Sequence, residues 1–562
     1  MIKCKNGILV LAVICFWSTA SVYAQSFQVG RNGMVVSASS IASQVGVDVL
    51  RRGGNAVDAA VAVGFALAVV FPEAGNIGGG GFMLIRTPTG AITALDYRET
   101  APGKATPQMY LAPDGSVIPN LSTEGALAVG VPGAVRGYEA AWRKFGKLPW
   151  KKLVSPAADL ARNGFPVTYY VHQGIAANQP LMQRFPASQA MFFPDGKVPE
   201  IGQLIRFPAL ARTLRLIAQK GAGEFYEGAT ARQLVQALTQ AGGIITLEDL
   251  KQYKVVERAP ILFNYRGYQI ASMPPPSSGG ICLGQILQML EPFSLSEYGF
   301  QSSTVIQIMV EAERRAYANR AYYLGDPDFV KIPLKQLLDP SINVSVTSSF
   351  NLDQATPSAA VSHFVFPESE ETTHFSVIDK DGMAVASTTT LNGSYGSGFV
   401  AEGTGILLNN EMDDFAIKPG VPNMYGLLGA EANAIAPNKR MLSSMTPTFV
   451  MHNDSLCWIL GTPGGGTIIT TIAQVIVNLI DFRMTLPKAV DAPRFHHQWL
   501  PDEVYYERNA FSPDLLNILE SKGYHLMPRS AIGDVNVIAV DRQNGYYLGM
   551  PDKRRQSAAA GY

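Results

Sequence analysis

The sequence predicts a protein of layered α/β architecture, because candidate helices occur in both halves of the chain and candidate strands fall into two groups. The 562 residues are 47% hydrophobic and only 16% charged, so the chain can bury a large core. Its length alone would suggest several domains, but no Ser/Gly-rich or charged linker divides it. We therefore expect one large compact unit.

The charge balance argues against partners that require a strong electrostatic field. Forty-five basic residues match 45 acidic residues, so the net charge is zero with neutral histidines. Nucleic acids and anionic membrane surfaces attract proteins with a basic excess, which this chain lacks. A small-molecule partner is the better expectation.

The first 24 residues have the layout of a signal peptide. Lys3 and Lys5 precede an apolar run at residues 8–17, and Ala24 occupies a small-residue cleavage position. The alternative, a single membrane anchor, fits less well because the run is too short for a hydrocarbon layer of about 30 Å. We predict that residues 1–24 are a signal peptide and that the protein is exported to the periplasm or the extracellular space.

Cysteines and histidines give no metal-binding pattern. Removal of residues 1–24 would leave Cys282 and Cys457, which are far apart and outside any Cys-x-x-Cys or Cys/His spacing. A disulfide between them is left open. His496 and His497 are adjacent, and neighbouring residues on a strand face opposite ways, so we assign both to structure.

Two core helices are expected after the signal segment. Apolar residues recur at helical spacing over residues 41–49, and Gly53-Gly54 provides a stop. Asn55 is a suitable N-cap for a second helix over residues 56–70, which is apolar almost all round.

A glycine-rich turn at residues 75–81 leads into a candidate β-hairpin that ends at residues 95–98. These glycines match no nucleotide-binding loop, so close packing is the better explanation. Residues 131–354 are predicted to be mostly helical. Breaks are expected at Pro156, Pro166, Pro186 and residues 274–276.

A second group of strands begins at residue 372. Polarity alternates over residues 372–378, Asp381-Gly382 provides a turn, and residues 384–391 form the return strand. The preceding stretch, residues 351–371, loses periodicity and is expected to be exposed or mobile. Further strands are predicted at residues 448–451, 457–460 and 535–540, with a helix after residues 464–466.

Thr372 is a candidate nucleophile if the chain is cut before it. A new α-amino group has a pKa of about 7.7 to 8.0, so it can act as the base for the hydroxyl of its own side chain. Spacing alone favours the other interpretation, in which Thr372 and Thr373 are ordinary strand residues. No Gly-x-Ser-x-Gly motif offers a serine nucleophile instead.

A family resemblance favours the nucleophile. Six blocks carry it in order, at residues 95–102, 372–379, 407–415, 440–447, 461–471 and 493–499. They resemble the γ-glutamyltransferases, which are N-terminal nucleophile hydrolases, over nearly the whole chain after the signal segment. The resemblance implies a four-layer α-β-β-α sandwich made from one precursor. Cleavage between Glu371 and Thr372 would give intertwined large and small subunits, residues 25–371 and 372–562.

The resemblance also implies the catalytic residues. Thr372 is both the cleavage site and the nucleophile, and Thr390 should hydrogen-bond its N-terminal group. Gly464 and Gly465 match the backbone amides of an oxyanion hole. Arg98 matches the arginine that grips the α-carboxylate of the γ-glutamyl group, a task suited to its planar fork. No metal or organic cofactor is required.

The remaining implied residues bind the substrate. Asn392, Glu411 and Asp414 match residues that hold its α-amino and α-carboxylate groups, and Ser443 and Ser444 match hydroxyls that bind the carboxylate. Residues 419–425 resemble a lid loop, with Tyr425 as its gate.

Two departures from the family pattern concern this site. Glu411 stands where many bacterial members carry glutamine, which changes the local charge. Gly466-Thr467 replaces the Ser-Arg expected after the oxyanion glycines, so the contacts beside them are left open.

The implied activity transfers the γ-glutamyl group of glutathione and related compounds to water, an amino acid or a dipeptide. Two alternatives are retained. One is an acylase for glutaryl-cephalosporin side chains on the same fold, although the lid favours γ-glutamyl chemistry. The other is a non-enzymatic exported binding protein, which would persist as one uncut chain.

Overall fold

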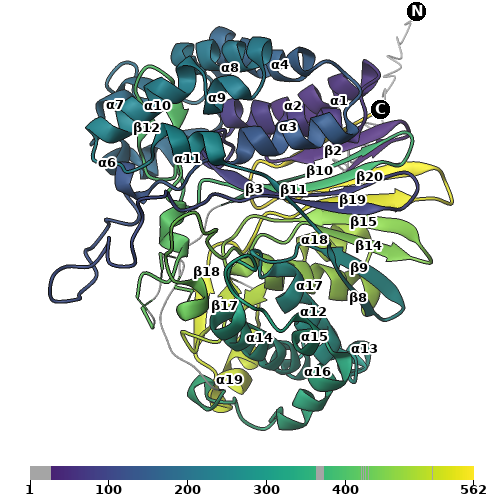
Figure 1. Ribbon diagram of the computed structural model, residues 1–562. Helices are drawn as coiled ribbons and strands as arrows, with labels where there is room; N and C mark the ends of the chain where they lie inside the picture. Colours follow the sequence, from purple (N-terminus) through teal and green to yellow (C-terminus); the bar gives the residue numbers. More distant parts are fainter. Residues whose placement is uncertain are drawn as a thin grey trace, which may run out of the picture.

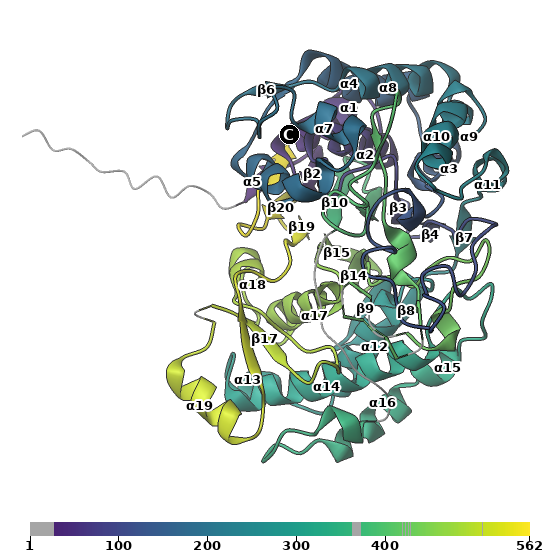
Figure 2. The same cartoon turned by 90° about the vertical axis from the view of Figure 1, so that its left-hand side faces the viewer.

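The computed structural model describes residues 27–361 and 372–562, apart from positions 419, 422, 425, 428 and 509. Two seven-stranded sheets pack face to face, and helices cover the outer face of each sheet. Figures 1 and 2 show the four layers from two directions. The predicted α-β-β-α sandwich is confirmed. The predicted signal peptide lies outside the described residues.

The first sheet carries the hairpin that begins at the candidate nucleophile. Its strand order is β21 (Ala558–Gly561), β2 (Gly33–Ser37), β10 (Thr373–Asp379), β11 (Ala384–Thr390), β3 (Gly80–Arg86), β4 (Ile92–Tyr97) and β7 (Val256–Arg258). All paired neighbours in it are antiparallel.

The second sheet has the strand order β1 (Gln28–Gly30), β20 (Tyr546–Pro551), β19 (Asn536–Asp541), β15 (Ser455–Gly461), β14 (Thr448–His452), β9 (Tyr268–Ser272) and β8 (Ile261–Tyr265). Strands from before and after residue 372 are interleaved in both sheets. Each sheet contains strands from both parts of the chain, so neither part could form a complete sheet alone.

Helices cover the first sheet on one side of the sandwich (Figure 1). They include α1 (Ser40–Arg51), α2 (Ala56–Val70), α3 (Ala134–Phe145), α4 (Trp150–Asn163), α8 (Pro208–Lys220), α9 (Gly223–Tyr226) and α10 (Ala229–Gln240). The other outer layer is built on α12 (Gly279–Leu290), α14 (Ser303–Tyr323) and α17 (Thr467–Ile480).

Shorter elements complete the fold. The helices are α5 (Tyr169–Ala177), α6 (Gln179–Met182), α7 (Pro186–Phe192), α11 (Leu247–Gln252), α13 (Leu295–Tyr298), α15 (Leu334–Leu337), α16 (Pro340–Val346), α18 (Leu486–Asp491) and α19 (Pro513–Ser521). The strands are β5 (Phe165–Pro166) with β6 (Leu204–Ile205), β12 (Val400–Ala401) with β13 (Ile406–Leu407), and β16 (Phe495–His496), β17 (Val504–Glu507) and β18 (Leu526–Arg529).

The core is divided into apolar layers by the two sheets, and β10 shows how. Phe375 and Val377 point into the layer beneath α1 and α2, whereas Ile378 points into the layer between the sheets. The period-two pattern predicted for this strand is therefore confirmed, with both faces buried.

The two predicted core helices are confirmed as α1 and α2. Asn55 caps α2, since its side chain accepts a hydrogen bond from the backbone N–H of Asp58 at 2.9 Å. The carboxylate of Asp58 accepts one from the backbone N–H of Asn55 at 3.0 Å, which completes a capping box. All of α2 is buried, as its apolar composition predicts.

Close packing also explains the glycine-rich turn. A Cβ atom on Gly79 would lie 2.1 Å from the carbonyl oxygen of Thr390, and one on Gly81 would lie 2.3 Å from that of Thr388. Both distances are far below van der Waals contact, so only glycine lets β3 and its approach lie this close to β11.

Residues 131–354 are mostly helical, as predicted, but one expected break is wrong and one group of strands was missed. Pro156 lies inside α4 and does not break it, because Leu153, Val154 and Ala157 are completely buried and tertiary packing holds the helix together. Residues 256–272 form strands β7, β8 and β9. These were missed because strand propensity depends on the neighbours across a sheet, which no local window contains.

The segment before residue 372 is only partly exposed. Ser358 is buried, its backbone N–H donates to Asp502 at 2.7 Å, and its carbonyl oxygen accepts the indole N–H of Trp499 at 3.0 Å. Residues 362–371 lie outside the described part of the chain.

The adjacent histidines are structural, as predicted. His496 lies between Thr470 and Gln498 at 2.8 and 2.9 Å, and His497 contacts Asp502 at 3.3 Å. The part of the chain that the structure describes contains no cluster of His, Cys, Asp or Glu suited to a metal ion. Its cysteines, Cys282 and Cys457, are both free thiols. No described helix is long and apolar enough to cross a bilayer.

The burial of His496 predicts a pH effect on stability. Burial lowers the pKa of His496 from 6.5 to about 3, so between these pH values the unfolded chain binds a proton that the folded chain does not. The contribution of His496 to the free energy of unfolding therefore falls as the pH drops through that window, by up to about 1.4 kcal/mol per pH unit. Urea unfolding of His496→Gln should show a flatter pH dependence between pH 3 and 6.5 than the wild type. Equal slopes would contradict this origin.

Candidate active site

The ends of six strands meet at one edge of the sandwich. In the β10–β11 register Thr373 pairs with Thr389, which places Thr372 opposite Thr390 at the open end of the hairpin. Thr390 pairs in turn with Gly80, the first residue of β3. Strand β4 ends beside it at Tyr97, directly before Arg98, and β15 and β19 meet at the corresponding end of the second sheet.

Thr372 and Thr390 are both nearly inaccessible, with 4% and 3% of their surface exposed. The hydroxyl of Thr390 accepts the backbone N–H of Asn392 at 2.7 Å, and its carbonyl oxygen accepts the side-chain amide of Asn76 at 2.7 Å. The other end of the Asn76 amide accepts the N–H of Gly79 at 2.9 Å. Thr390 is thus held rigidly by backbone and amide groups that sequence reasoning did not single out.

The glycine run at residues 464–466 lies between β15 and α17. Gly464 and Gly465 have φ angles of +133° and +50°, which L side chains rarely adopt. Thr467 opens α17, and its backbone N–H and hydroxyl both donate to the carbonyl oxygen of Gly464 at 2.9 and 2.7 Å. A helix N-terminus carries partial positive charge, so the loop is suited to stabilise an oxyanion. The departure at residues 466–467 thus preserves a helix start.

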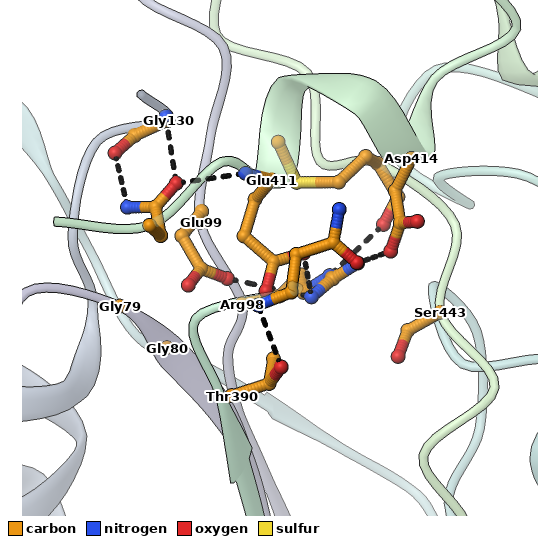
Figure 3. Close-up of polar contacts among 12 residues, drawn as sticks. Gly79, Gly80, Arg98, Glu99, Gly130, Thr390, Glu411, Asp414 and Ser443 are labelled. Carbon is orange, nitrogen blue, oxygen red and sulfur yellow. Dashed lines mark hydrogen bonds and ion pairs between the residues drawn. The ribbon is translucent and has the colours of Figure 1, made fainter. Parts of the chain in front are cut away.

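Arg98 lies at the centre of a buried ionic cluster (Figure 3). Its guanidinium forms ion pairs with Glu411 and Asp414 and lies 3.6 Å from a carboxylate oxygen of Glu99. It also donates to the carbonyl oxygens of Met441 and Leu442 at 3.3 and 3.2 Å. Arg98 is 1% exposed, and its direct pairing with the two predicted acidic residues was not anticipated.

The cluster places three carboxyl groups around one guanidinium. Burial raises the pKa of Glu99 and, more strongly, that of Glu411, although Arg98 opposes both shifts. The pKa of Asp414 is raised for the same reason. Burial lowers the pKa of Arg98, but the surrounding carboxylates outweigh burial and raise it overall. Sequence reasoning missed Glu99, although it directly follows Arg98.

A buried amide positions Glu411. The side chain of Asn409 accepts the backbone N–H groups of Glu411 and Gly130 at 3.0 and 2.9 Å, and it donates to the carbonyl oxygens of Gly78 and Gly130 at 2.8 and 2.9 Å. Residues 411–414 therefore form a buried 3₁₀ turn. Without the resemblance, this acidic stretch would read as a solvated turn.

Ser443 and Ser444 lie on a buried segment beside this cluster. The carbonyl oxygen of Ser443 accepts two hydrogen bonds from Ser278, both at 2.7 Å. The hydroxyl of Ser444 accepts a hydrogen bond from the guanidinium of Arg320 at 3.1 Å. Arg320 also donates to the hydroxyl of Ser278 at 3.0 Å, and it is a further buried cation that the sequence did not indicate.

Asn392 connects the threonine pair to the predicted lid. It has a positive φ of 72°, and its side-chain amide donates to the carbonyl oxygen of Asn410 at 3.1 Å. In the lid stretch, Asn423 donates to Asp414 at 2.8 Å and the N–H of Met424 donates to Asp413 at 2.6 Å. The stretch thus binds back onto the acidic turn. Tyr425 and Glu371 lie outside the described residues.

His374 links β10 of the first sheet to β15 and β19 of the second sheet. Its ring lies between the hydroxyls of Thr388 and Ser376 at 2.8 and 3.1 Å, and its carbonyl oxygen accepts the side-chain amide of Asn536 at 3.1 Å. Burial lowers its pKa to about 3, so the ring is neutral. A Cβ on Gly461, the last residue of β15, would lie 2.2 Å from that ring. The ring and glycine therefore set the distance between the two sheets.

A family model described as Gamma-glutamyltranspeptidase matches residues 42–562. The match includes every described residue of the cluster, the threonine pair and the glycine loop. The chain belongs to the γ-glutamyltranspeptidase family.

Known relatives match this chain over almost their whole lengths. The chain is 48% identical over 535 residues to the glutathione hydrolase proenzyme of Escherichia coli strain K12, covering 95% of this chain and 92% of that protein. The solved cephalosporin acylase of Bacillus halodurans has a TM-score of 0.84 at 27% identity, covering 95% of this chain and 97% of that one. The γ-glutamyltranspeptidase structure from Helicobacter pylori is 44% identical with a TM-score of 0.57, covering 57% and 93%.

The contact between Gly461 and His374 generates a prediction. Gly461→Ala places a methyl group inside the histidine ring volume, so the sheets must separate or His374 must leave its hydrogen bonds. Overpacking of this kind costs about 1–3 kcal/mol, and thermal denaturation should show the loss. The matched control is Gly223→Ala in α9, where an added Cβ meets nothing within 4 Å. Equal stability of the two variants would contradict this role.

Proposed function

We propose that the protein is an autoprocessing γ-glutamyltransferase and glutathione hydrolase with Thr372 as nucleophile. The observation that carries the proposal is the buried cluster around Arg98, in which one guanidinium faces Glu99, Glu411 and Asp414. An α-amino acid head group has one carboxylate and one ammonium, so it fits a site that offers a guanidinium and surplus carboxylates. Membership of the family and the 48% identical glutathione hydrolase proenzyme support this choice.

In self-cleavage, the hydroxyl oxygen of Thr372 attacks the carbonyl carbon of Glu371. The peptide C–N bond breaks as an ester forms on the side-chain oxygen, and the hydroxyl proton passes to the departing amine. Water then hydrolyses the ester and releases the carboxylate of Glu371. The products are a large subunit of residues 25–371 and a small subunit of residues 372–562. The interleaved strands of the two sheets would keep them associated after the cut.

In turnover, the freed α-amino group of Thr372 takes the proton of its own hydroxyl as that oxygen attacks the γ-amide carbon. The N–H groups of Gly464 and Gly465 stabilise the resulting oxyanion, aided by the positive end of α17. The C–N bond of the substrate breaks, and the amine leaves with the proton, as cysteinylglycine leaves from glutathione. Thr390 orients the nucleophile from the opposite strand.

The same base then activates the second nucleophile. Water yields glutamate, and the amine of an amino acid or dipeptide yields a new γ-glutamyl compound. No metal or organic cofactor takes part in either half of this scheme. The signal-like residues 1–24 support action in the periplasm or outside the cell.

Substrate binding would redistribute the ion pairs of Arg98. The α-carboxylate of the substrate binds to part of the guanidinium and to Ser443 and Ser444. The ammonium binds to Glu411, Asp414 and the side-chain amide of Asn392. The lid contacts from Asn423 and Met424 lie directly on this acidic turn. Closure of the lid, with Tyr425 as gate, would then exclude water from the head group.

The acidic surplus also separates two substrate classes. A glutaryl side chain has a terminal carboxylate but no ammonium, so it would compete with the buried carboxylates for Arg98 and bring them no further cation. The cephalosporin acylase shares the fold at 27% identity, which is well below the 48% of the glutathione hydrolase. We therefore favour γ-glutamyl donors over glutaryl-cephalosporins.

The processing step yields the central prediction. Wild-type protein should contain two chains, and N-terminal sequencing of the smaller one should begin at Thr372. Thr372→Ala lacks the attacking hydroxyl and should remain one inactive chain, whereas Thr372→Ser keeps a hydroxyl and should be cut, more slowly. Cleavage of Thr372→Ala at the same bond, or full activity of the uncut wild type, would refute the mechanism.

Substitution of Arg98 tests the head-group site. Arg98→Lys keeps the positive charge needed by the buried carboxylates but loses the fork that binds carboxylate bidentately. Loss of a charge-assisted hydrogen bond costs about 1.5–3 kcal/mol, so KM for γ-glutamyl-p-nitroanilide should rise about tenfold or more. Turnover at saturation should fall less than kcat/KM. Unchanged kinetics in a correctly processed variant would remove Arg98 from the site.

A further inference from the structure

A cavity of about 310 Å³ lies at the end of the sandwich opposite the nucleophile. It is lined by residues of the turns that join β1 to β2, β3 to β4, β10 to β11 and β19 to β20. These hairpin ends lie together at the right-hand side of the sheets in Figure 1. The inner lining includes Ile378 and Val540, which also contact the core between the two sheets. The cavity is therefore an opening onto an apolar layer.

Arg86 lines this cavity and is unusually buried for an arginine that forms no ion pair with a described carboxylate. It is 8% exposed, and one nitrogen of its guanidinium donates to the carbonyl oxygen of Asp454 at 2.8 Å. Among the residues that the structure describes, no carboxylate forms an ion pair with it. Burial lowers the pKa of Arg86, and repulsion from Arg542 lowers it further, against a smaller attraction from Asp454. An anion beside Arg86 would relieve both costs.

Three further cations line the cavity with Arg86, namely Arg31, Lys380 and Arg542. Arg31 donates to the hydroxyl of Tyr546 at 2.7 Å, and that ring also lines the cavity. Lys380 and Arg542 are exposed at the rim.

The acidic side chains of the lining have other partners. Asp381 pairs with Lys147 and Lys380, both at 3.6 Å. Both oxygens of Asp541 accept hydrogen bonds from Asn544, at 3.1 and 2.9 Å. The lining therefore holds four cationic and two anionic side chains, and neither carboxylate forms an ion pair with Arg86 or Arg542 among the described residues.

We propose that this cavity binds a small organic phosphate, with the phosphate group between Arg86 and Arg542 and a compact apolar part against Ile378 and Val540. Guanidinium groups bind phosphate oxygens bidentately, which suits the paired arginines. The apolar inner wall gives an uncharged portion of the ligand a surface to cover. The site is independent of the γ-glutamyl site, because it lies at the far end of the β10–β11 hairpin from Thr372.

Titration calorimetry on the processed protein tests the proposal. The probes are phenyl phosphate, inorganic phosphate and benzyl alcohol, at pH 7 and low ionic strength, where charge pairing is least screened. Phenyl phosphate should bind saturably at one site per molecule and more tightly than inorganic phosphate. Benzyl alcohol should not saturate. Absence of saturable phenyl phosphate binding would overturn the proposal.

Two exposed residues allow the site to be altered without disturbing the core. The double variant Lys380→Gln with Arg542→Gln should weaken phenyl phosphate binding about tenfold, through loss of charge-assisted contacts. The matched control is Arg232→Gln, an exposed arginine on α10 remote from the cavity, which should bind as the wild type does. Equal weakening in the control, or none in the double variant, would show nonspecific attraction and refute the site.

Two further measurements complete the test. Vesicles of phosphatidylcholine with phosphatidic acid distinguish a lipid headgroup from a soluble phosphate. If the wild type co-sediments with these vesicles and the double variant does not, the natural ligand is a lipid headgroup. If phenyl phosphate binds but the protein does not co-sediment, the natural ligand is a soluble phosphate. Hydrolysis of γ-glutamyl-p-nitroanilide should be unchanged in the double variant. Failure of the phosphate-binding proposal would therefore leave the proposed enzyme activity unaffected.

Discussion

Antiparallel pairing of β10 with β11 organises the first sheet around the candidate active site. Its register places Thr372 opposite Thr390 at one end of the hairpin. The pair lies in the middle of the first sheet, with β2 on one side and β3 on the other. A shift of one residue would move every side chain of the strand to the opposite face, and Phe375 and Ile378 would exchange apolar layers. Burial on both faces therefore holds the hydroxyl of Thr372 in one direction.

Charge inside the sandwich is concentrated around Arg98. Buried carboxylates are costly unless a cation or a ligand compensates them, and here Glu99, Glu411 and Asp414 share one close guanidinium. The backbone of the 3₁₀ turn is fixed by Asn409, so the carboxyl groups of Glu411 and Asp414 start from an ordered backbone. A fixed backbone lowers the cost of ordering on binding, so that only the ion pairs of Arg98 have to be redistributed. The same ion pairs hold the guanidinium of Arg98 in place.

The sequence predicted the elements whose patterns are local. The apolar composition of α2, its cap at Asn55 and the alternation of β10 each lie within a window of a few residues, and all are confirmed. The prediction failed where a local rule competed with packing. Proline is unfavourable inside a helix, yet α4 accepts Pro156 because its buried face stabilises the helix more than the missing hydrogen bond destabilises it.

Patterns within the sequence predicted the fold class and the hairpin that begins at Thr372, and the family resemblance indicated which residues to consider together. The contacts that these residues make follow from the packing of the two sheets. Arg98 and Asp414 are separated by 316 positions, and the ring of His374 meets Gly461 only because two different sheets pack face to face. Contacts of this range depend on the order of strands in each sheet, which periodicity within one segment does not encode. For the same reason, the contacts of Glu99, Asn409 and Arg320 could be identified only in the folded structure.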